Sequence, residues 1–381
     1  VRDLAALGAE IDAATAEAAS AFGDGTVFVE PYVEHGRHVE VQVVGASDGV
    51  LVLGERDCSV QRRHQKVIEE APAPGLSDAT RAALHDAARA AAAAIDYRGA
   101  GTVEFLYDPG RERFWFLEMN TRLQVEHPVT ELTTGLDLVA LQLAVAQGEP
   151  LPSPNPPAAS GSSIEVRLYA EDPAQDWQPQ SGTLTRLDIP GITTEFGPLP
   201  SSPATVRPGL RLDSGVVDGS EVSIHYDPML AKVISWAPTR AAAARLLAEA
   251  LTRAQIHGLR TNRDLLVRVL SHPDFVAGAT DTAFLDRHGL EALAAPLLDA
   301  GETHLAALAA ALADTAYRRS VAVTQPGLPA GWRNLPSGLT RKTFTHSGGD
   351  LEISYAVRRG TLIAPAHEGV ALVSAEPGRV V

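Results

Sequence analysis

Polar side chains of several kinds alternate along residues 118–126, directly after an aromatic and apolar run at 114–117. The apolar run predicts a buried strand. Glu118 and Asn120 have the same parity, so a strand that continues through them points both side chains to one face. The later positions of this parity carry a guanidinium, an amide and a carboxylate: Arg122, Gln124 and Glu126. We therefore expect a fork-shaped donor, an amide and a base in a row.

A second carboxylate, Glu104, lies in the strand-like run 101–107, which a DPG turn at 108–110 joins to the first strand. Folding this hairpin brings Glu104 and Glu118 toward each other. Two like charges on a largely apolar sheet are costly, and a divalent cation is the simplest compensation. The all-oxygen set of Glu104, Glu118 and Asn120 suits Mg²⁺ or Mn²⁺, which usually also binds substrate phosphates, rather than zinc. The alternative is that both glutamates are solvated residues on an open strand face.

Residues 55–66 combine four basic side chains with Gln61, His64 and the single cysteine of the chain. Taken alone, such a run is typical of a solvated basic loop. Cys58 lies inside it, and a small buried neighbour of a site fits this cysteine better than a reactive thiol. The basic members are Arg56, Arg62, Arg63 and Lys66.

The chain of 381 residues is long enough for two or three domains, and a hydrophobic content of 45% permits ordinary globular cores. A formal net charge of −15 argues against a nucleic-acid-binding surface. No apolar run reaches the length of about 18 residues that a membrane span needs, and the first residues are not a signal peptide. One cysteine excludes an intramolecular disulfide and fits a reducing cytoplasm. Valine at position 1, without an initiator methionine, suggests a fragment or a partial gene model.

Hydrophobic periodicity and turn residues divide the chain into helical and strand-rich stretches. Helices are predicted at 3–22, 78–95, 133–148, 240–257, 261–271 and 289–318, the second with Ser77 as its N-cap. Strands are predicted at 27–33, 37–45 and 50–54, in the hairpin, and as short segments over 163–236 and 342–374. The strand at 37–45 alternates polar and apolar residues, which predicts one polar and one apolar face.

The segment EMNTRLQVEHPVTE at 118–131 closely resembles the signature of biotin carboxylase, a member of the ATP-grasp superfamily. The resemblance continues through ERDCSVQRRHQK at 55–66 and EVRLYAED at 165–172. It covers about residues 1–288, and motifs of this length are highly specific. Residues 289–381 resemble the linking region of an acyl-CoA carboxylase α subunit, which docks the α and β subunits.

This resemblance implies an α+β chain in three parts. Residues 1–150 would form a partial ATP-grasp domain, and residues 151–288 a biotin carboxylase C-terminal domain. Residues 289–381 would form a helix followed by a small antiparallel β segment.

The family reaction begins when ATP phosphorylates bicarbonate to carboxyphosphate. This decomposes to CO₂ and phosphate, and a ureido nitrogen of biotin captures the CO₂. The implied cofactors are ATP, Mg²⁺ or Mn²⁺, and biotin on a carrier domain outside this chain. The implied partners are that biotin carboxyl carrier domain and a carboxyltransferase β subunit, in an oligomeric cytoplasmic enzyme. The carboxyltransferase selects the acyl-CoA, so this chain does not reveal it.

Bicarbonate must be held in line and must lose a proton before it attacks. Arg122 offers a planar, permanently charged fork for its oxygens. Gln124 and the backbone N–H of Val125 can add hydrogen bonds, and Glu126 is the candidate general base. The resemblance implies that Lys66 also lies near the bicarbonate.

Biotin must then be deprotonated, and its ureido oxygen becomes negative. Arg167 would stabilise this enolate, as a positive partner of a developing oxyanion does. The resemblance implies that the released phosphate accepts the biotin proton.

The segment EPYV at 30–33 resembles the family's linker that contacts adenine. The resemblance implies that the purine edge meets Glu30 and the backbone of Pro31 and Val33. Many relatives carry lysine at the position of Pro31, and a backbone contact survives that change. The other nucleotide contacts implied are Leu106 on the ring, His38 near the ribose, and Gln61 and His64.

The family's N-terminal α/β domain, its Gly-rich lid and its biotin-attachment motif do not occur in this sequence. We therefore expect a truncated chain, with incomplete phosphate binding and weak or absent turnover in isolation. One alternative is another ATP-grasp ligase, such as one of the carbamoyl-phosphate type, although the EVR context of Arg167 favours biotin. The other is a catalytically incomplete assembly module of the holoenzyme.

Overall fold

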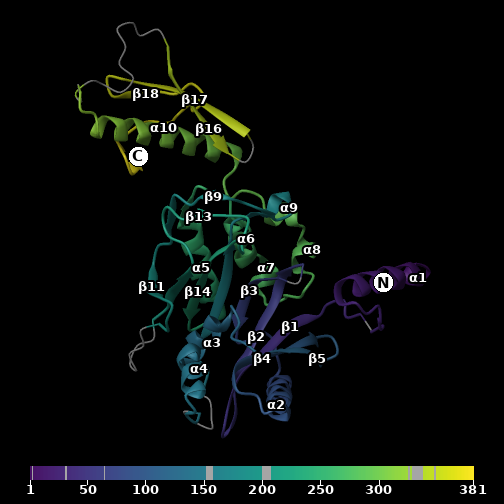
Figure 1. The fold of residues 1–381 in the computed structure, drawn as a ribbon. Helices are drawn as coiled ribbons and strands as arrows, with labels where there is room; N and C mark the ends of the chain where they lie inside the picture. The colour runs from purple at the N-terminus through teal and green to yellow at the C-terminus, as the bar shows by residue number, and fades with distance from the viewer. Residues whose placement is uncertain are drawn as a thin grey trace. The chain divides into compact units, whose positions relative to one another are not determined.

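The computed structural model describes residues 1, 3–30, 32–63, 65–151, 158–199, 207–324, 327, 338–346 and 349–381. These residues form two compact units, Val1–Ala295 and Pro296–Val381 (Figure 1). The division expected between residues 150 and 151 lies inside the first unit. It stays a prediction, as does the division expected between residues 288 and 289.

One nine-stranded sheet runs through the first unit. In sheet order its strands are β11 (Ile192–Glu195), β12 (Gly209–Ser214), β14 (Met229–Ala237), β6 (Ser162–Tyr169), β3 (Gln65–Ala71), β2 (Gly49–Arg62), β1 (Arg37–Ala46), β4 (Gly99–Asp108) and β5 (Arg113–Asn120). All neighbouring strands are antiparallel except the parallel pair β11–β12. The pairing of β3 with β6 joins the five earlier strands to the four later ones.

Helix α2 (Asp78–Ala94) covers the apolar face of β1. It begins at Ser77, whose hydroxyl accepts a hydrogen bond from the backbone N–H of Thr80 at 3.2 Å, so the predicted N-cap is confirmed. The residues of α2 and β1 that pack together are Leu84, Ala88, Ala92, Val39, Val41 and Val43. The predicted alternation along β1 is therefore confirmed: its odd positions fill this core, and its even positions point to the other face.

Only the later part of the helix predicted at 133–148 forms, because a glycine turn separates it from an earlier helix that was not predicted. Helix α3 (His127–Thr134) ends at Gly135, which adopts a left-handed φ of 74°, and α4 (Leu138–Ala146) follows. The predicted start at residue 133 is wrong because Gly135 ends α3 there, in a conformation that glycine adopts at little cost. Among the described residues no single helix is long and apolar enough to cross a membrane. The pair α3–α4, bent by 97°, passes that test by length and composition alone.

Short elements complete the first unit. Its other helices are η1 (Leu4–Ala6), α1 (Leu7–Phe22), η2 (Pro173–Gln175), α5 (Arg240–Arg253), α6 (Arg263–Ser271), α7 (Pro273–Val276), α8 (Phe284–His288) and α9 (Leu290–Leu293). Its two-stranded ladders are β7 (Glu171–Asp172) with β8 (Gln178–Pro179), β9 (Gly182–Thr183) with β13 (Glu221–Val222), and β10 (Arg186–Asp188) with β15 (Gln255–His257). The helix predicted at 240–257 stops at residue 253 because residues 255–257 pair with β10 instead.

Three strand predictions need correction. The described residues of 27–33 form no strand. β2 runs far beyond the predicted end at residue 54, because it pairs with β1 on one side and with β3 on the other. β5 is not buried: Phe116 and Leu117 are 57% and 48% exposed, because β5 is the edge strand and pairs with β4 alone.

The described residues of the second unit form one helix and a small antiparallel β segment. Its elements are α10 (Ala300–Ser320), β16 (Thr340–His346), β17 (Gly349–Arg358), β18 (Thr361–Ile363), β19 (Ala375–Glu376) and β20 (Arg379–Val380). A capping box of Asp299 and Glu302 precedes α10, which begins eleven residues after the predicted start at residue 289, since α9 is a separate helix. The core packs α10 against β17 through Leu308, Ala311, Leu312, Leu351, Ile353 and Tyr355.

Gly45→Ala should destabilise the first unit by about 3 kcal/mol, because a Cβ at this position would lie 1.8 Å from the backbone oxygen of Tyr97. Urea unfolding followed by circular dichroism measures this change. Gly8→Ala is the matched control, since nothing lies within 4 Å of its added Cβ. Equal unfolding midpoints for the two variants would contradict the packing described here.

Candidate active site

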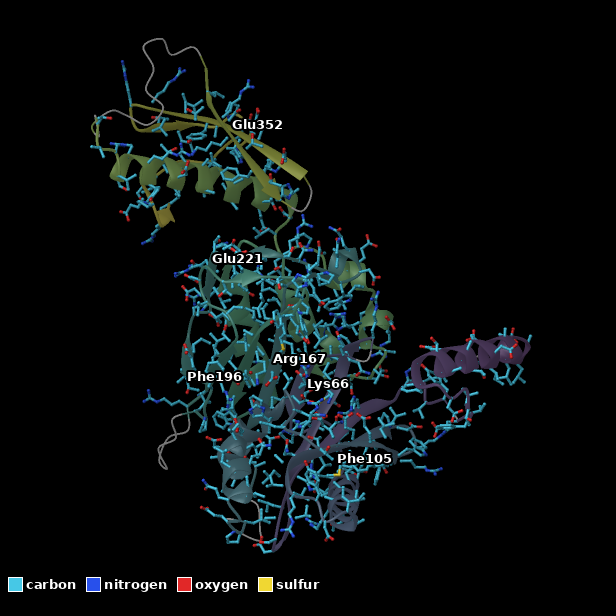
Figure 2. All side chains as sticks on the ribbon, viewed as in Figure 1. Lys66, Phe105, Arg167, Phe196, Glu221 and Glu352 are labelled. Carbon is cyan, nitrogen blue, oxygen red and sulfur yellow. The ribbon has the colours of Figure 1, made fainter. Side chains whose placement is uncertain are left out.

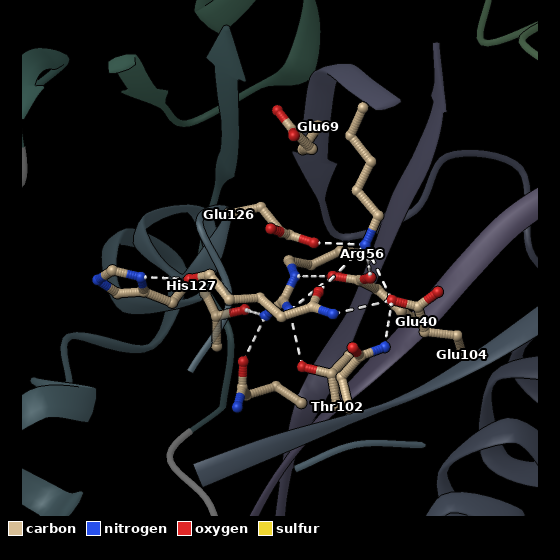
Figure 3. Close-up of polar contacts among 12 residues, drawn as sticks. Glu40, Arg56, Glu69, Thr102, Glu104, Glu126 and His127 are labelled. Atoms are coloured by element: carbon tan, nitrogen blue, oxygen red, sulfur yellow. Dashed lines mark hydrogen bonds and ion pairs between the residues drawn. The ribbon is translucent and has the colours of Figure 1, made fainter. Parts of the chain in front are cut away.

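The ammonium group of Lys66, near the start of β3, lies among four polar side chains. Three of them, Glu40, Glu104 and Glu126, are labelled in Figure 3. Its Nζ donates to Glu40 Oε2 at 2.5 Å and to Glu126 Oε1 at 2.5 Å. It also donates to Glu104 Oε1 at 3.0 Å and to Gln124 Oε1 at 3.1 Å. One cation therefore joins β1, β3, β4 and the loop before α3.

The carboxylates around Lys66 keep the cluster ionised. Burial alone would lower the pKa of Lys66, but Glu40, Glu126 and Glu104 raise it well above its usual range. Burial would raise the pKa of Glu40, but the charges of Lys66 and Arg56 lower it to about 2. Burial is likewise outweighed at Glu104, where the hydrogen bond from His38 and the charge of Lys66 hold the pKa low.

Arg56 of β2 supports this cluster from within the sheet and is completely buried. Its Nε donates to Glu40 Oε1 at 2.6 Å, and its Nη1 donates to Gln42 Oε1 at 2.6 Å and to Thr130 Oγ1 at 2.9 Å. Glu40 is thus held by Arg56 on one oxygen and by Lys66 on the other. The sequence analysis did not assign Glu40 a role, although its parity with His38 was the available signal.

The three predicted metal ligands lie together. Glu104 and Glu118 are directly opposite each other in the β4–β5 ladder, as the hairpin predicts. The Nδ2 atom of Asn120 donates to Glu104 Oε1 at 3.1 Å and to Glu118 Oε1 at 2.9 Å. Because a half-turn of the amide exchanges its nitrogen and oxygen, the same three side chains can offer three oxygens to a hard divalent cation. The set therefore fits Mg²⁺ or Mn²⁺.

The prediction that these acids lie on a largely apolar part of the sheet is wrong. Lys66 and the ring of His38, whose Nε2 lies 2.8 Å from Glu104 Oε2, already offset the charge of Glu104. A metal ion is therefore not needed to stabilise the Glu104 carboxylate. What favours a metal ion here is the set of three oxygen ligands, not an uncompensated negative charge. His38, Glu40 and Glu104 also place ligand atoms within 4.8 Å of one another.

The alternation predicted through residue 126 fails after Asn120, where β5 ends. The chain turns, and the N–H groups of His127 and Val129 bond to the carbonyls of Gln124 and Glu126 at the start of α3. Gln124 and Glu126 are buried at Lys66, but Arg122 is exposed and donates to its neighbour's carbonyl at 3.4 Å. The assignment of Arg122 to bicarbonate stays a prediction.

Glu126 connects Lys66 to Arg167, which lies on β6 (Figure 2). Its Oε2 accepts from Arg167 Nη2 at 3.1 Å, while its Oε1 faces Lys66. Arg167 Nε in turn donates to Glu69 Oε1 at 2.6 Å. Burial would lower the pKa of Arg167, but Glu69 and Glu126 raise it, so the guanidinium stays charged. The predicted base and the predicted biotin-enolate partner are thus hydrogen-bonded to each other.

Two further acids, Glu69 and Glu165, were missed by the sequence analysis as site residues. They are opposite each other in the β3–β6 ladder and both are fully buried. Burial raises the pKa of Glu69 to about 7 and that of Glu165 well above its usual range. Their position beside Arg167 depends on long-range strand pairing, which no local motif reveals.

The structure brings together only some of the residues predicted to bind the nucleotide. A Cβ at Gly36 would lie 2.5 Å from Leu106 Cδ1 and 3.4 Å from Val33 Cγ1, so these two side chains are near neighbours. Glu30 is exposed and Gln61 is half-buried at the end of β2. Pro31 and His64 lie outside the described residues.

One other sequence expectation concerns a single residue. Cys58 is buried, and burial raises the pKa of its thiol well above its usual range, which agrees with an unreactive neighbour of the site. His127 Nδ1 donates to the Gln124 carbonyl at 2.7 Å. Burial and the charges of Lys232 and Arg211 lower the pKa of His127 to about 4, so this ring is neutral at pH 7.

Two family models match the chain in succession. One, "Carbamoyl-phosphate synthase L chain, ATP binding domain", matches residues 1–154, and the other, "Biotin carboxylase C-terminal domain", matches residues 165–287. The ATP-binding match, the mixed sheet and a carboxylate–amide set suited to Mg²⁺ define an ATP-grasp protein. With the second domain following it in the same chain, the protein belongs to the biotin carboxylase family.

Named relatives agree with this family. The propionyl-CoA carboxylase alpha chain of Ruegeria pomeroyi is 47% identical over 312 residues, covering 78% of this chain and 44% of the relative. The biotin carboxylase of Halalkalibacterium halodurans is 47% identical over 273 residues, covering 71% of this chain and 57% of the relative. This chain therefore spans about half the length of the curated relatives that it matches.

Solved structures give the same result. The biotin carboxylase domain of a thermophilic 2-oxoglutarate carboxylase bound to bicarbonate matches with a TM-score of 0.69 and 37% identity, covering 77% of this chain and 63% of that chain. The Campylobacter jejuni biotin carboxylase–β-γ-ATP complex matches with a TM-score of 0.67 and 40% identity, covering 75% and 60%.

Lys66→Met should destabilise the first unit by about 3–5 kcal/mol, because it leaves buried carboxylates without their shared ammonium. Chemical unfolding at pH 7 measures the loss. Arg89→Met is the control, since its pair with Asp86 is largely exposed and should contribute at most about 1 kcal/mol. Similar losses in the two variants would show that the Lys66 cluster does not hold the strands together.

His127 should make the protein lose stability as the pH falls from about 6.5 to about 4. Over that window the unfolded chain binds a proton at this imidazole and the folded chain does not, which costs the fold up to about 3 kcal/mol. His127→Gln should flatten this part of the unfolding free energy profile. His225→Gln removes an exposed imidazole and should keep the wild-type slope; equal slopes in all three proteins would contradict a buried neutral ring.

Proposed function

We propose that this chain carries the site for ATP-dependent carboxylation of biotin with bicarbonate, through carboxyphosphate, as part of a cytoplasmic acyl-CoA carboxylase. The observation that carries the proposal is the continuous hydrogen-bonded chain from Lys66 through Glu126 to Arg167. It lies beside the set of Glu104, Glu118 and Asn120, because Glu104 also accepts from Lys66. The proposed phosphoryl-transfer site at Glu104 and the proposed enolate site at Arg167 are therefore joined through Lys66 and the carboxylate of Glu126.

Glu104, Glu118 and Asn120 would hold Mg²⁺ or Mn²⁺, which supplies neutralisation of phosphate charge when bound. Lys66 and Gln124 hold bicarbonate from the buried side, and the backbone N–H of Val125 adds a donor. The ammonium group of Lys66 has three N–H donors and is surrounded by four protein acceptors, so an oxygen of the anion would replace one of these acceptors. Arg122 is proposed to close over the anion from the exposed loop.

Glu126 is proposed to accept the bicarbonate proton. Its two oxygens face two cations, so the carboxylate is held in one orientation as it does so. Arg167 then stabilises the negative ureido oxygen of biotin, while Glu69 keeps its Nε anchored. The released phosphate is the proposed acceptor of the biotin proton.

ATP is proposed to bind with its adenine near Glu30, Pro31, Val33 and Leu106, and with His38, Gln61 and His64 toward ribose and phosphates. The closeness of Val33 and Leu106 supports the adenine part. A biotin carboxylase domain from Hydrogenobacter thermophilus, 37% identical to this chain, was solved with MgADP and bicarbonate. Those ligands match the chemistry of the residues gathered around Lys66.

The proposed partners are a biotin carboxyl carrier domain and a carboxyltransferase β subunit, in an oligomer. The similarity to a propionyl-CoA carboxylase alpha chain supports both. The helix and β segment of Pro296–Val381 form a compact unit with its own core, as a subunit-docking module would.

Glu126→Gln should lower biotin-dependent ADP release in the reconstituted carboxylase by about 10²- to 10⁴-fold, because the amide cannot accept the bicarbonate proton. MgADP binding, followed by calorimetry, should stay near the wild-type value. Glu112→Gln, in the exposed β4–β5 turn, is the control.

Unchanged activity of Glu126→Gln would favour a scaffold role for this chain. ATP hydrolysis that ammonia stimulates and biotin does not would favour a ligase of the carbamoyl-phosphate type.

A further inference from the structure

Glu69 and Glu165 are buried register partners at the centre of the nine-stranded sheet. They face each other across β3 and β6, and neither side chain is exposed. Glu69 Oε1 accepts from Arg167 Nε at 2.6 Å. The other oxygen of Glu69 and both oxygens of Glu165 have no hydrogen-bond partner among the described residues. Four carboxyl oxygens are therefore buried with one donor between them, and three of the four have none among the described residues.

The cations near this pair are engaged elsewhere. Arg167 on β6 also binds Glu126, and Lys66 on β3 is shared with Glu40, Glu104 and Glu126. Lys232 on β14 donates to the Val125 carbonyl at 2.9 Å and lies 3.1 Å from Asp213. The remaining ionisable side chains on the adjacent α3 are His127 and Glu131, the latter paired with Arg211. The charges of Lys232 and Lys66 act to lower the pKa values of Glu165 and Glu69 respectively, but among the described residues no cation donates a hydrogen bond to Glu165 or to the second oxygen of Glu69.

Two buried carboxylates that share one cation cannot both stay ionised at low cost. A single proton between them removes one charge and supplies the missing donor, from one carboxyl group to a free oxygen of the other. The raised pKa values of both residues agree with this state. The pair then presents one negative charge to Arg167 rather than two.

We propose that Glu69 and Glu165 share one proton at neutral pH and thereby position Arg167 for biotin. The singly charged pair anchors the guanidinium through Nε alone and leaves its Nη groups for Glu126 and the substrate. When hydroxide removes the shared proton as water, a second carboxylate draws the guanidinium away from the substrate. This role rests on the proposed function, in which Arg167 meets the ureido oxygen of biotin.

Glu165→Gln tests the positioning, because glutamine keeps the shape of the side chain but never ionises. In the reconstituted carboxylase, the KM for biotin should rise about tenfold or more between about pH 7 and pH 9.5 for the wild type, with a smaller change in kcat. Glu165→Gln should keep the low KM across this range. Glu291→Gln, an exposed glutamate on α9, is the matched control and should behave as the wild type.

Glu69→Gln and Glu69→Asp separate positioning from folding. The glutamine variant loses the charge that anchors Arg167 and should raise the KM for biotin at every pH, while the aspartate variant should recover part of it. Identical alkaline profiles for the wild type and Glu165→Gln would overturn the inference. A complex that never turns over biotin would instead contradict the proposed function.

Infrared difference spectroscopy tests the shared proton without turnover. The wild type at neutral pH should show the C=O stretch of a protonated carboxyl group, and Glu165→Gln should lack it. A wild-type protein without this band would overturn the inference even if its activity is normal.

Discussion

A single buried ammonium group organises the first unit of this protein. Lys66 binds carboxylates from β1, β4 and the loop before α3, so three separate segments converge on one nitrogen. Buried carboxylates are tolerated only when opposite charges and donors satisfy them, and Lys66 with Arg56 meets that condition for Glu40 and Glu104. The same constraint puts the metal set and the general-base candidate within reach of one another. The ion pairs that stabilise the sheet are thus the same ones that position the site residues.

Local patterns in the sequence were sufficient for the parts of this site that lie on neighbouring strands. Parity along β1 and the turn between β4 and β5 predicted the two-faced strand and the pairing of Glu104 with Glu118, both confirmed. The motif at 118–131 identified the family. Patterns failed where the backbone leaves a regular repeat. Gln124 reaches Lys66 from a turn rather than a strand, and Gly135 ends a helix that periodicity alone would continue.

The residues that no motif revealed come from contacts between distant segments. Glu40 meets Arg56 and Lys66 only after β1, β2 and β3 are aligned, and Glu69 meets Arg167 only after β3 pairs with β6. The exposure of Phe116 was equally invisible, because an apolar run does not disclose that its strand will lie at a sheet edge. Sequence therefore predicted which residues lie close together better than it predicted their environment.

The ladder between β3 and β6 has a consequence for how this family can vary. Successive side chains on a strand point to opposite faces, so inserting or deleting one residue in either strand would turn its later side chains over. Glu69 and Glu165 would then lose their register, and Arg167 would leave Glu126. Length changes in homologues should accordingly accumulate in the connections that flank these strands, while the two strands themselves keep a constant number of residues.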